Sequence, residues 1–245
     1  GIEEQIGHLR EAIDSLVKAE FKLNQTSATL YSGAAVTLSA TTNLTGDITW
    51  KSSDAKVATV DAKGTVTAVN AGRATITAAL GKVSATFTVT VKNPSITAKA
   101  DSSVIYTKSK TTTKINVAKD GVTGNATFRS SNKKVATVSA NGIVKAKKAG
   151  KVNITVQVGN HKQVVKITVK KPTMKLTKAS AKLKKGKKVT IKVKAAPVSK
   201  VTFKSSNKKV ATVSSKGVVK AKKKGTATIT VKCNGITKKF KVTVK

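Results

Sequence analysis

The chain has 245 residues, of which 39% are hydrophobic and only 3% aromatic, and its formal net charge is +38. Abundant Val and Thr with only three prolines favour short strands around small cores and argue against a disordered chain. The single cysteine excludes an intrachain disulfide, and no apolar run is long enough to predict a membrane-spanning helix. We therefore expect no membrane insertion.

Residues 1–20 are predicted to form an amphipathic helix, because apolar residues recur at alternating spacings of four and three. We expect this helix to be the last helix of a preceding helical domain and to pack on the first sandwich. Alternatively, it self-associates or docks on a missing domain. The sequence enters this pattern at Gly1 with no signal peptide, so we expect a piece of a longer protein. The apolar stripe consists of Ile2, Ile6, Leu9, Ile13 and Leu16.

The rest of the chain contains three internal repeats. Each has an aromatic residue, a basic residue, Ser-Ser and Asp or Asn, and two residues later Val-Ala-Thr-Val. The equivalent aromatic residues, Trp50, Phe128 and Phe203, are 78 and then 75 residues apart. A period of this length with so many matching positions indicates repeated structural units. The aligned segments are residues 48–60, 126–138 and 201–213.

Apolar and polar residues alternate within each repeat, which is typical of half-buried strands. In residues 189–194, for example, every second residue is Val or Ile and the others are Thr or Lys. Two-residue turns are expected at Gly81-Lys82, Gly159-Asn160 and Asn234-Gly235, between pairs of such strands. Several short strands in each repeat predict an all-β protein made of β-sandwiches.

Prolines at Pro94 and Pro172 end the last strand of a repeat and predict the domain boundaries. The joints are short and lack Gly/Ser-rich linkers, so an elongated rod is expected. The predicted domains are the helix over residues 1–20 and sandwiches over residues 21–93, 94–171 and 172–245.

The pattern W/F-x-S-S-[ND]-x-x-V-A-T-V-x-x-x-G-x-V resembles that of the bacterial immunoglobulin-like group 2 family across residues 21–245. The resemblance implies three tandem Ig-like Greek-key β-sandwiches with Trp50, Phe128 and Phe203 as core aromatics. It also implies non-catalytic repeats that serve as spacers, adhesive modules or wall-associated modules, or as accessory repeats of secreted glycan-degrading enzymes. The lysine enrichment resembles that of Gram-positive surface or secreted proteins.

We expect no catalytic, cofactor-binding or metal site in these residues, although the parent protein could be an enzyme. His8 and His161 lie in different units without Cys or carboxylate residues at ligand spacing. Cys233 falls at an inward strand position, which favours a small core residue. Asp54 and its two Asn counterparts are expected to cap a turn by accepting from a backbone amide two residues on.

The positive charge rises along the chain. The formal net charge is −3 over residues 1–20, +4 over 21–93, +14 over 94–171 and +23 over 172–245, where no Asp or Glu occurs. Such lysine clusters without acidic residues predict a polyanion-binding surface. The candidate residues are Lys147, Lys148, Lys184, Lys185, Lys187, Lys188, Lys222, Lys223 and Lys224.

The expected partners are anionic cell-wall polymers, teichoic acid or peptidoglycan, which places the chain outside a Gram-positive cell. The predicted function is a spacer that associates with the wall electrostatically. An adhesin for a host surface, or a carbohydrate-binding accessory module of an extracellular glycan-degrading enzyme, stays open. Nucleic acid is expected to bind only non-specifically, because arginines and stacking aromatics are scarce.

Overall fold

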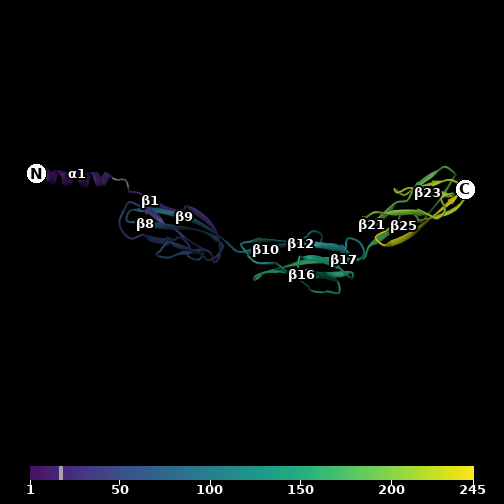
Figure 1. Cartoon of the computed structure of the whole chain (residues 1–245), viewed down its shortest axis with the longest axis horizontal. Helices are drawn as coiled ribbons and strands as arrows, with labels where there is room; N and C mark the ends of the chain where they lie inside the picture. Colours follow the sequence, from purple (N-terminus) through teal and green to yellow (C-terminus); the bar gives the residue numbers. More distant parts are fainter. Residues whose placement is uncertain (17–18) are drawn as a thin grey trace. The chain divides into compact units, whose positions relative to one another are not determined.

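A computed structural model of the chain describes residues 1–16 and 19–245 (Figure 1). The helix α1 spans Ile2–Leu16, as predicted. Its side chains at Ile2, Ile6 and Leu9 are 78%, 46% and 63% exposed. The expected packing of this helix on the following sandwich stays a prediction. The side chains of Ile13 and Leu16 lie outside the described part, and no described helix is long and apolar enough to cross a bilayer.

The described chain separates into two compact units, residues 1–95 with 119–122 and residues 96–118 with 123–245. The first unit holds one buried apolar core and the second holds two. Strands β1–β9, β10–β17 and β18–β26 surround these cores and form the first, second and third sandwich (Figure 1). The all-β class is confirmed, while the exact domain boundaries stay a prediction.

The first sandwich pairs a sheet of order β2-β9-β8-β5 with one of order β3-β7-β6, and a short pair β1-β4 completes it. β2 runs parallel to β9, and the other pairs are antiparallel. Ile76, Phe87 and Val89 lie fully buried between the sheets. The strands are β1 (Phe21–Leu23), β2 (Ser27–Tyr31), β3 (Ala35–Thr37), β4 (Ala40–Thr42), β5 (Thr49–Ser52), β6 (Ala58–Val60), β7 (Thr65–Ala68), β8 (Gly72–Leu80) and β9 (Val83–Lys92).

The second sandwich has the sheets β11-β17-β16-β13 and β10-β12-β15-β14. Again an early strand, β11, runs parallel to the last strand, β17. This non-sequential strand order is that of an Ig-like Greek key, in which the chain crosses between the two sheets, as it does from β12 to β13 and from β13 to β14. The strands are β10 (Ser95–Ala100), β11 (Val104–Tyr106), β12 (Thr112–Asp120), β13 (Thr127–Ser130), β14 (Ala136–Val138), β15 (Ile143–Ala146), β16 (Gly150–Val158) and β17 (His161–Lys170).

The third sandwich repeats this plan with sheets β19-β26-β25-β22 and β20-β24-β23 and the pair β18-β21. The strand predicted over residues 189–194 is divided into two, because the chain first pairs with β24 and then with β18. The strands are β18 (Thr173–Leu176), β19 (Ser180–Leu183), β20 (Lys188–Thr190), β21 (Val193–Ala196), β22 (Thr202–Ser205), β23 (Ala211–Val213), β24 (Val218–Ala221), β25 (Gly225–Cys233) and β26 (Ile236–Val244).

The three predicted hairpin turns are confirmed. Asn234 and Gly235 have φ angles of 53° and 72°, which is the pair of positive values that a tight turn between twisted strands requires. Gly81 and Gly159 have φ angles of 59° and 54° at the matching turns. Cys233, at the end of β25, is unpaired and only 3% exposed, so its predicted core position is confirmed.

The predicted core aromatics Trp50, Phe128 and Phe203 pack against the three cores but are only half-buried. A glycine backbone lies against each ring. A Cβ added at these glycines would lie 2.7–2.8 Å from a ring atom, closer than real Cβ contacts allow. Their φ angles are also positive, at 79°, 74° and 79°, so glycine is required at all three positions. These glycines are Gly64, Gly142 and Gly217.

Candidate functional site

The Ser-Ser-Asx motif fixes a loop at one end of every sandwich. In the third, Ser205 Oγ donates to the Ala211 carbonyl over 2.7 Å and accepts from the Asn207 amide over 3.2 Å. Asn207 Oδ1 then accepts from the Lys209 amide over 3.0 Å. The same bonds occur in the other two sandwiches, so the predicted turn-capping role is confirmed for Asp54, Asn132 and Asn207.

In the third sandwich this loop meets two others. The Gly186 amide donates to the Ala221 carbonyl over 3.0 Å, and the Ala221 amide donates to the Lys187 carbonyl over 3.0 Å. The Lys222 amide donates to the Val210 carbonyl over 2.8 Å. The β19–β20, β22–β23 and β24–β25 loops are thereby joined through their backbones. We call this surface the loop end of the third sandwich.

Ten lysines are located at this loop end, and all of them are exposed. They include the seven lysines predicted for this repeat, so two runs that are 34 residues or more apart in the sequence lie next to each other. Lys208, Lys209 and Lys220 were missed. The ten are Lys184, Lys185, Lys187, Lys188, Lys208, Lys209, Lys220, Lys222, Lys223 and Lys224.

Two of these lysines form a cross-strand pair. Lys188 on β20 lies directly opposite Lys220 on β24, and side chains in such pairs have Cβ atoms about 4.5–5.5 Å apart. The second pair of opposed lysines in this sandwich joins Lys175 on β18 to Lys194 on β21. Because residues 172–245 contain no Asp or Glu, no acidic side chain of this sandwich can neutralise them.

The second sandwich has the same loop end with fewer lysines. The Ala146 amide donates to the Thr111 carbonyl over 2.8 Å, and the Lys147 amide donates to the Val135 carbonyl over 2.8 Å. The predicted residues Lys147 and Lys148 are located here, in a different sandwich from the other seven. The lysines of this loop end are Lys108, Lys110, Lys133, Lys134, Lys145, Lys147 and Lys148.

The loop end of the first sandwich has the same backbone but almost none of this charge. The Gly33 amide donates to the Ala68 carbonyl over 2.8 Å, and the Val69 amide donates to the Val57 carbonyl over 2.8 Å. The charged residues that residues 21–93 place there are Lys56 and Asp54, which lie in the same turn, and Asp120 accepts a hydrogen bond from the Tyr31 hydroxyl beside this loop. Two of the loop-end backbone bonds recur in all three sandwiches, which differ in the side chains placed around them.

The outer face of the β19-β26-β25-β22 sheet is a second basic surface of the third sandwich. Lysines alternate there with threonines; Thr230, for example, lies opposite both Lys204 and Lys239. In the first sandwich the same face consists mainly of threonines on β8 and β9. We call the lysine-bearing face the sheet face, and its lysines are Lys182, Lys204, Lys232, Lys239 and Lys241.

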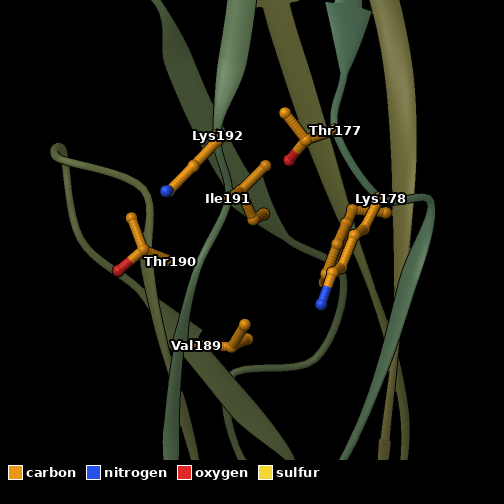
Figure 2. A pocket seen from close by; sticks show the side chains of 7 residues that line it. Thr177, Lys178, Val189, Thr190, Ile191 and Lys192 are labelled. Atoms are coloured by element: carbon orange, nitrogen blue, oxygen red, sulfur yellow. The ribbon is translucent and has the colours of Figure 1, made fainter.

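A pocket of about 360 Å³ is also present in the third sandwich (Figure 2). Lys178 and Lys192 lie on opposite sides of Ile191 in this view. No carboxylate, imidazole or thiol lines the pocket, so it offers no acid–base pair, nucleophile or metal ligand. The lining residues are Thr177, Lys178, Val189, Thr190, Ile191, Lys192 and Phe240.

Trp50 reaches a surface concavity of about 620 Å³ in the first sandwich, together with Ser39, Asp47 and Lys63. The sequence predicts a purely internal role for this indole, but its half-exposed ring also borders solvent. The second sandwich has a matching concavity of about 650 Å³ with Phe128 in place of the indole. Across residues 1–16 and 19–245, no cluster of three or more His, Cys, Asp or Glu side chains could hold a metal ion.

Two curated relatives match parts of the chain. Kappa-carrageenase of Pseudoalteromonas carrageenovora is 47% identical over 76 residues, which cover 29% of this chain and 19% of that protein. Ice-binding protein 1 of Shewanella frigidimarina (strain NCIMB 400) is 32% identical over 140 residues, which cover 52% of this chain and 16% of that protein. The chain therefore spans less than a fifth of the length of either relative.

Among solved structures, the S-layer protein rSbsC(31-844) matches with a TM-score of 0.39 and 20% identity, over 93% of this chain and 40% of that chain. The I9-I11 tandem of titin matches with a TM-score of 0.40 and 12% identity, over 92% of this chain and 99% of that one. The family described as bacterial Ig-like domain matches residues 124–171. The family described as bacterial Ig-like domain (group 2) matches residues 19–91 and 171–244, more than half of the sequence, and the chain belongs to this family.

Proposed function

We propose that this chain is a non-catalytic spacer region of a secreted or surface protein of a Gram-positive bacterium, and that its third sandwich binds anionic cell-wall polymers. Teichoic acid and peptidoglycan are the proposed partners. The observation that supports this most directly is the accumulation of lysines on a shared backbone, from one at the loop end of the first sandwich to ten at that of the third.

The physical argument rests on charge density without compensation. Every lysine of residues 172–245 is exposed, and no acidic side chain lies among these residues. At physiological ionic strength, screening acts over about 8 Å, so neighbouring lysines of the loop end act together on a polymer of closely spaced anions. The sandwich has no arginine, which argues against geometric recognition of a single carboxylate or phosphate group.

The proposal is tested by co-sedimentation of the full chain with purified Gram-positive cell walls, with and without their teichoic acid. We expect binding that falls when teichoic acid is removed and that is lost near 0.5 M salt, where the screening length is about 4 Å. Retention that is unchanged by both treatments would contradict the proposal.

A second candidate is a carbohydrate-binding accessory module, and two observations favour it. The half-exposed Trp50 lines an open concavity together with Asp47 and Lys63, and the kappa-carrageenase match has 47% identity. An indole beside polar groups suits the apolar face and the hydroxyls of a sugar ring. The chain would then bind kappa-carrageenan in about 0.5 M salt, where non-specific charge attraction is screened.

The variant Trp50→Ala should abolish this binding. Trp50→Phe is the matched control, since Phe128 and Phe203 occupy the same position in the other sandwiches. Equal binding of kappa-carrageenan by the wild type and Trp50→Ala in high salt would exclude this second function.

A further inference from the structure

We propose that the loop end of the third sandwich is one polyanion site whose occupant acts as the missing counterion and stabilises the fold of that sandwich. This inference rests on the proposed association with anionic polymers and specifies where it occurs and what it does. The ligand is a linear polymer of closely spaced phosphate groups, and both wall teichoic acid and free polyphosphate have this chemistry.

The first argument is geometric. Three loops that are distant in the sequence are held together by backbone bonds of 2.8–3.0 Å, through Gly186, Ala221 and Val210. The lysines on them therefore sit on rigid strand ends and tight turns. The backbone of these loops is therefore already ordered before a polymer binds, so ordering of the loops adds little to the entropy cost of binding an extended anion.

The second argument concerns the opposed lysines. Like charges directly opposite on neighbouring strands destabilise a sheet, and Lys188 and Lys220 are such a pair. The same register positions hold Ala35 and Thr67 in the first sandwich and Thr112 and Lys145 in the second. The repulsive pair therefore occurs at this position in the third sandwich alone.

The third argument is that the third sandwich has no acidic side chain that could neutralise this lysine pair. Residues 172–245 have 23 lysines and no acidic side chain, so in the unliganded protein only dissolved ions screen the pair. A polymer that bridges Lys188 and Lys220 replaces this repulsion by attraction. Since the folded sandwich concentrates charges that are spread apart in the unfolded chain, the polymer binds the folded form more tightly and stabilises it.

The site is tested with the full chain and linear inorganic polyphosphate, using two variants that each remove five positive charges. The loop-end variant carries Gln at Lys184, Lys185, Lys187, Lys222 and Lys223, and the control carries Gln at the five sheet-face lysines. Charge loss at the site should weaken binding about tenfold, whereas the control should lose less than about threefold. Equal weakening in both would overturn the single site while leaving general polyanion association intact.

The stabilising role is tested by hydrogen exchange of residues 172–245. Polyphosphate should slow exchange in the wild-type third sandwich several-fold. Lys188→Gln alone should slow exchange without ligand, because it removes the repulsion, and should reduce the further gain from polyphosphate. Faster exchange in unliganded Lys188→Gln, or no effect of polyphosphate on the wild type while it binds, would overturn the counterion role. No polyphosphate or wall binding by the wild type would overturn the proposed function itself.

Discussion

At the loop end of the first sandwich, the Gly33 amide donates to the Ala68 carbonyl over 2.8 Å, and in the third sandwich the Gly186 amide does the same to Ala221 over 3.0 Å. The side chains around these equivalent bonds differ. The register positions of Ala35 and Thr67 in the first sandwich are occupied by Lys188 and Lys220 in the third. Positions that carry backbone bonds or contact the core are thus restricted, whereas the solvent-facing positions of the same loops are free to gain charge.

The largest loss of stability is expected from substitutions of the glycines that contact the core aromatic residue in the first and third sandwiches. Gly64→Ala and Gly217→Ala should each destabilise their own sandwich by about 2–4 kcal/mol, since a Cβ would collide with Trp50 or Phe203 at positive φ. Urea unfolding followed by sandwich-resolved hydrogen exchange measures this.

Gly81→Ala is the control for these substitutions. Gly81 also has a positive φ, but an added Cβ would meet nothing within 4 Å. It should cost only about 1 kcal/mol. A cost at Gly64 no larger than that at Gly81 would show that the ring contact does not restrict the position.

The buried serine bond comes next. Ser205→Ala leaves the Ala211 carbonyl without its 2.7 Å donor at a position that is 7% exposed, and should cost about 1–2 kcal/mol. Ser52→Ala removes the same bond in the first sandwich at a half-buried position, so its cost should be smaller. The unfolding free energies of both variants provide the comparison. A larger loss for Ser52→Ala would contradict the view that burial sets the value of this bond.

The polyanion affinity of the third loop end should be transferable to the first loop end by lysine substitutions. Lysines placed at Ser32, Ala34, Ala35, Val69 and Asn70 reproduce the third loop end on the first sandwich, because the backbone bonds there are equivalent. In the loop-end variant described above, these substitutions should restore polyphosphate affinity about fivefold, or about 1 kcal/mol. Fluorescence titration measures the gain. No gain in a folded transplant would show that the backbone arrangement does not organise the site.

Much of this fold follows from the sequence, because the residues that define it recur three times. The alternation of apolar and polar residues and the Asn234-Gly235 turn locate the hairpins. The Asp or Asn of each repeated motif predicts the turn-capping hydrogen bond that the structure contains. The inward position of Cys233 follows from its alignment with Leu80 and Val158, which are both buried. The division of residues 189–194 into two strands was not predicted, because a change of strand partner leaves no mark on local alternation.

The candidate site was only partly predictable. Lysine-rich segments at 184–188 and 222–224 stand out in the sequence, but Lys220 is an ordinary outward residue of a strand. It becomes part of the site only through the β20–β24 register, which pairs residues 32 positions apart. Lys208 and Lys209 belong to the repeated motif and could have been found by asking which loops meet at one end of a sandwich.

The smallest expected effect is a pH dependence confined to the first sandwich. Asp61 Oδ1 accepts from the Thr65 amide over 2.8 Å and from the Lys63 amide over 2.9 Å, and these bonds, the one from Thr65 foremost, lower the pKa of Asp61 below its usual 3.8. A lowered folded-state pKa gives stability that is present above the unfolded-state pKa and is lost as the pH falls through the folded-state value.

Acidification from about pH 5 to about pH 3 should therefore begin to weaken the first sandwich, and Asp61→Asn should reduce this loss. In the matching turn of the third sandwich, Ser214 Oγ accepts a 3.1 Å bond from the Val218 amide. A serine hydroxyl does not titrate in this pH range, so this turn should not weaken on acidification. Urea midpoints across this range make the comparison. An identical acid loss in Asp61→Asn would rule out this carboxylate as the cause.

The most direct measurement of the central claim is an amide-resolved NMR titration of the full chain with wall teichoic acid at low and high salt. We expect perturbations that are largest at residues 184–188, 208–209 and 220–224, smaller at Lys147 and Lys148, and absent from Gly33 and Val69. These perturbations should vanish in high salt. Equal perturbation of the first and third loop ends, or perturbations centred on the sheet face, would contradict the account.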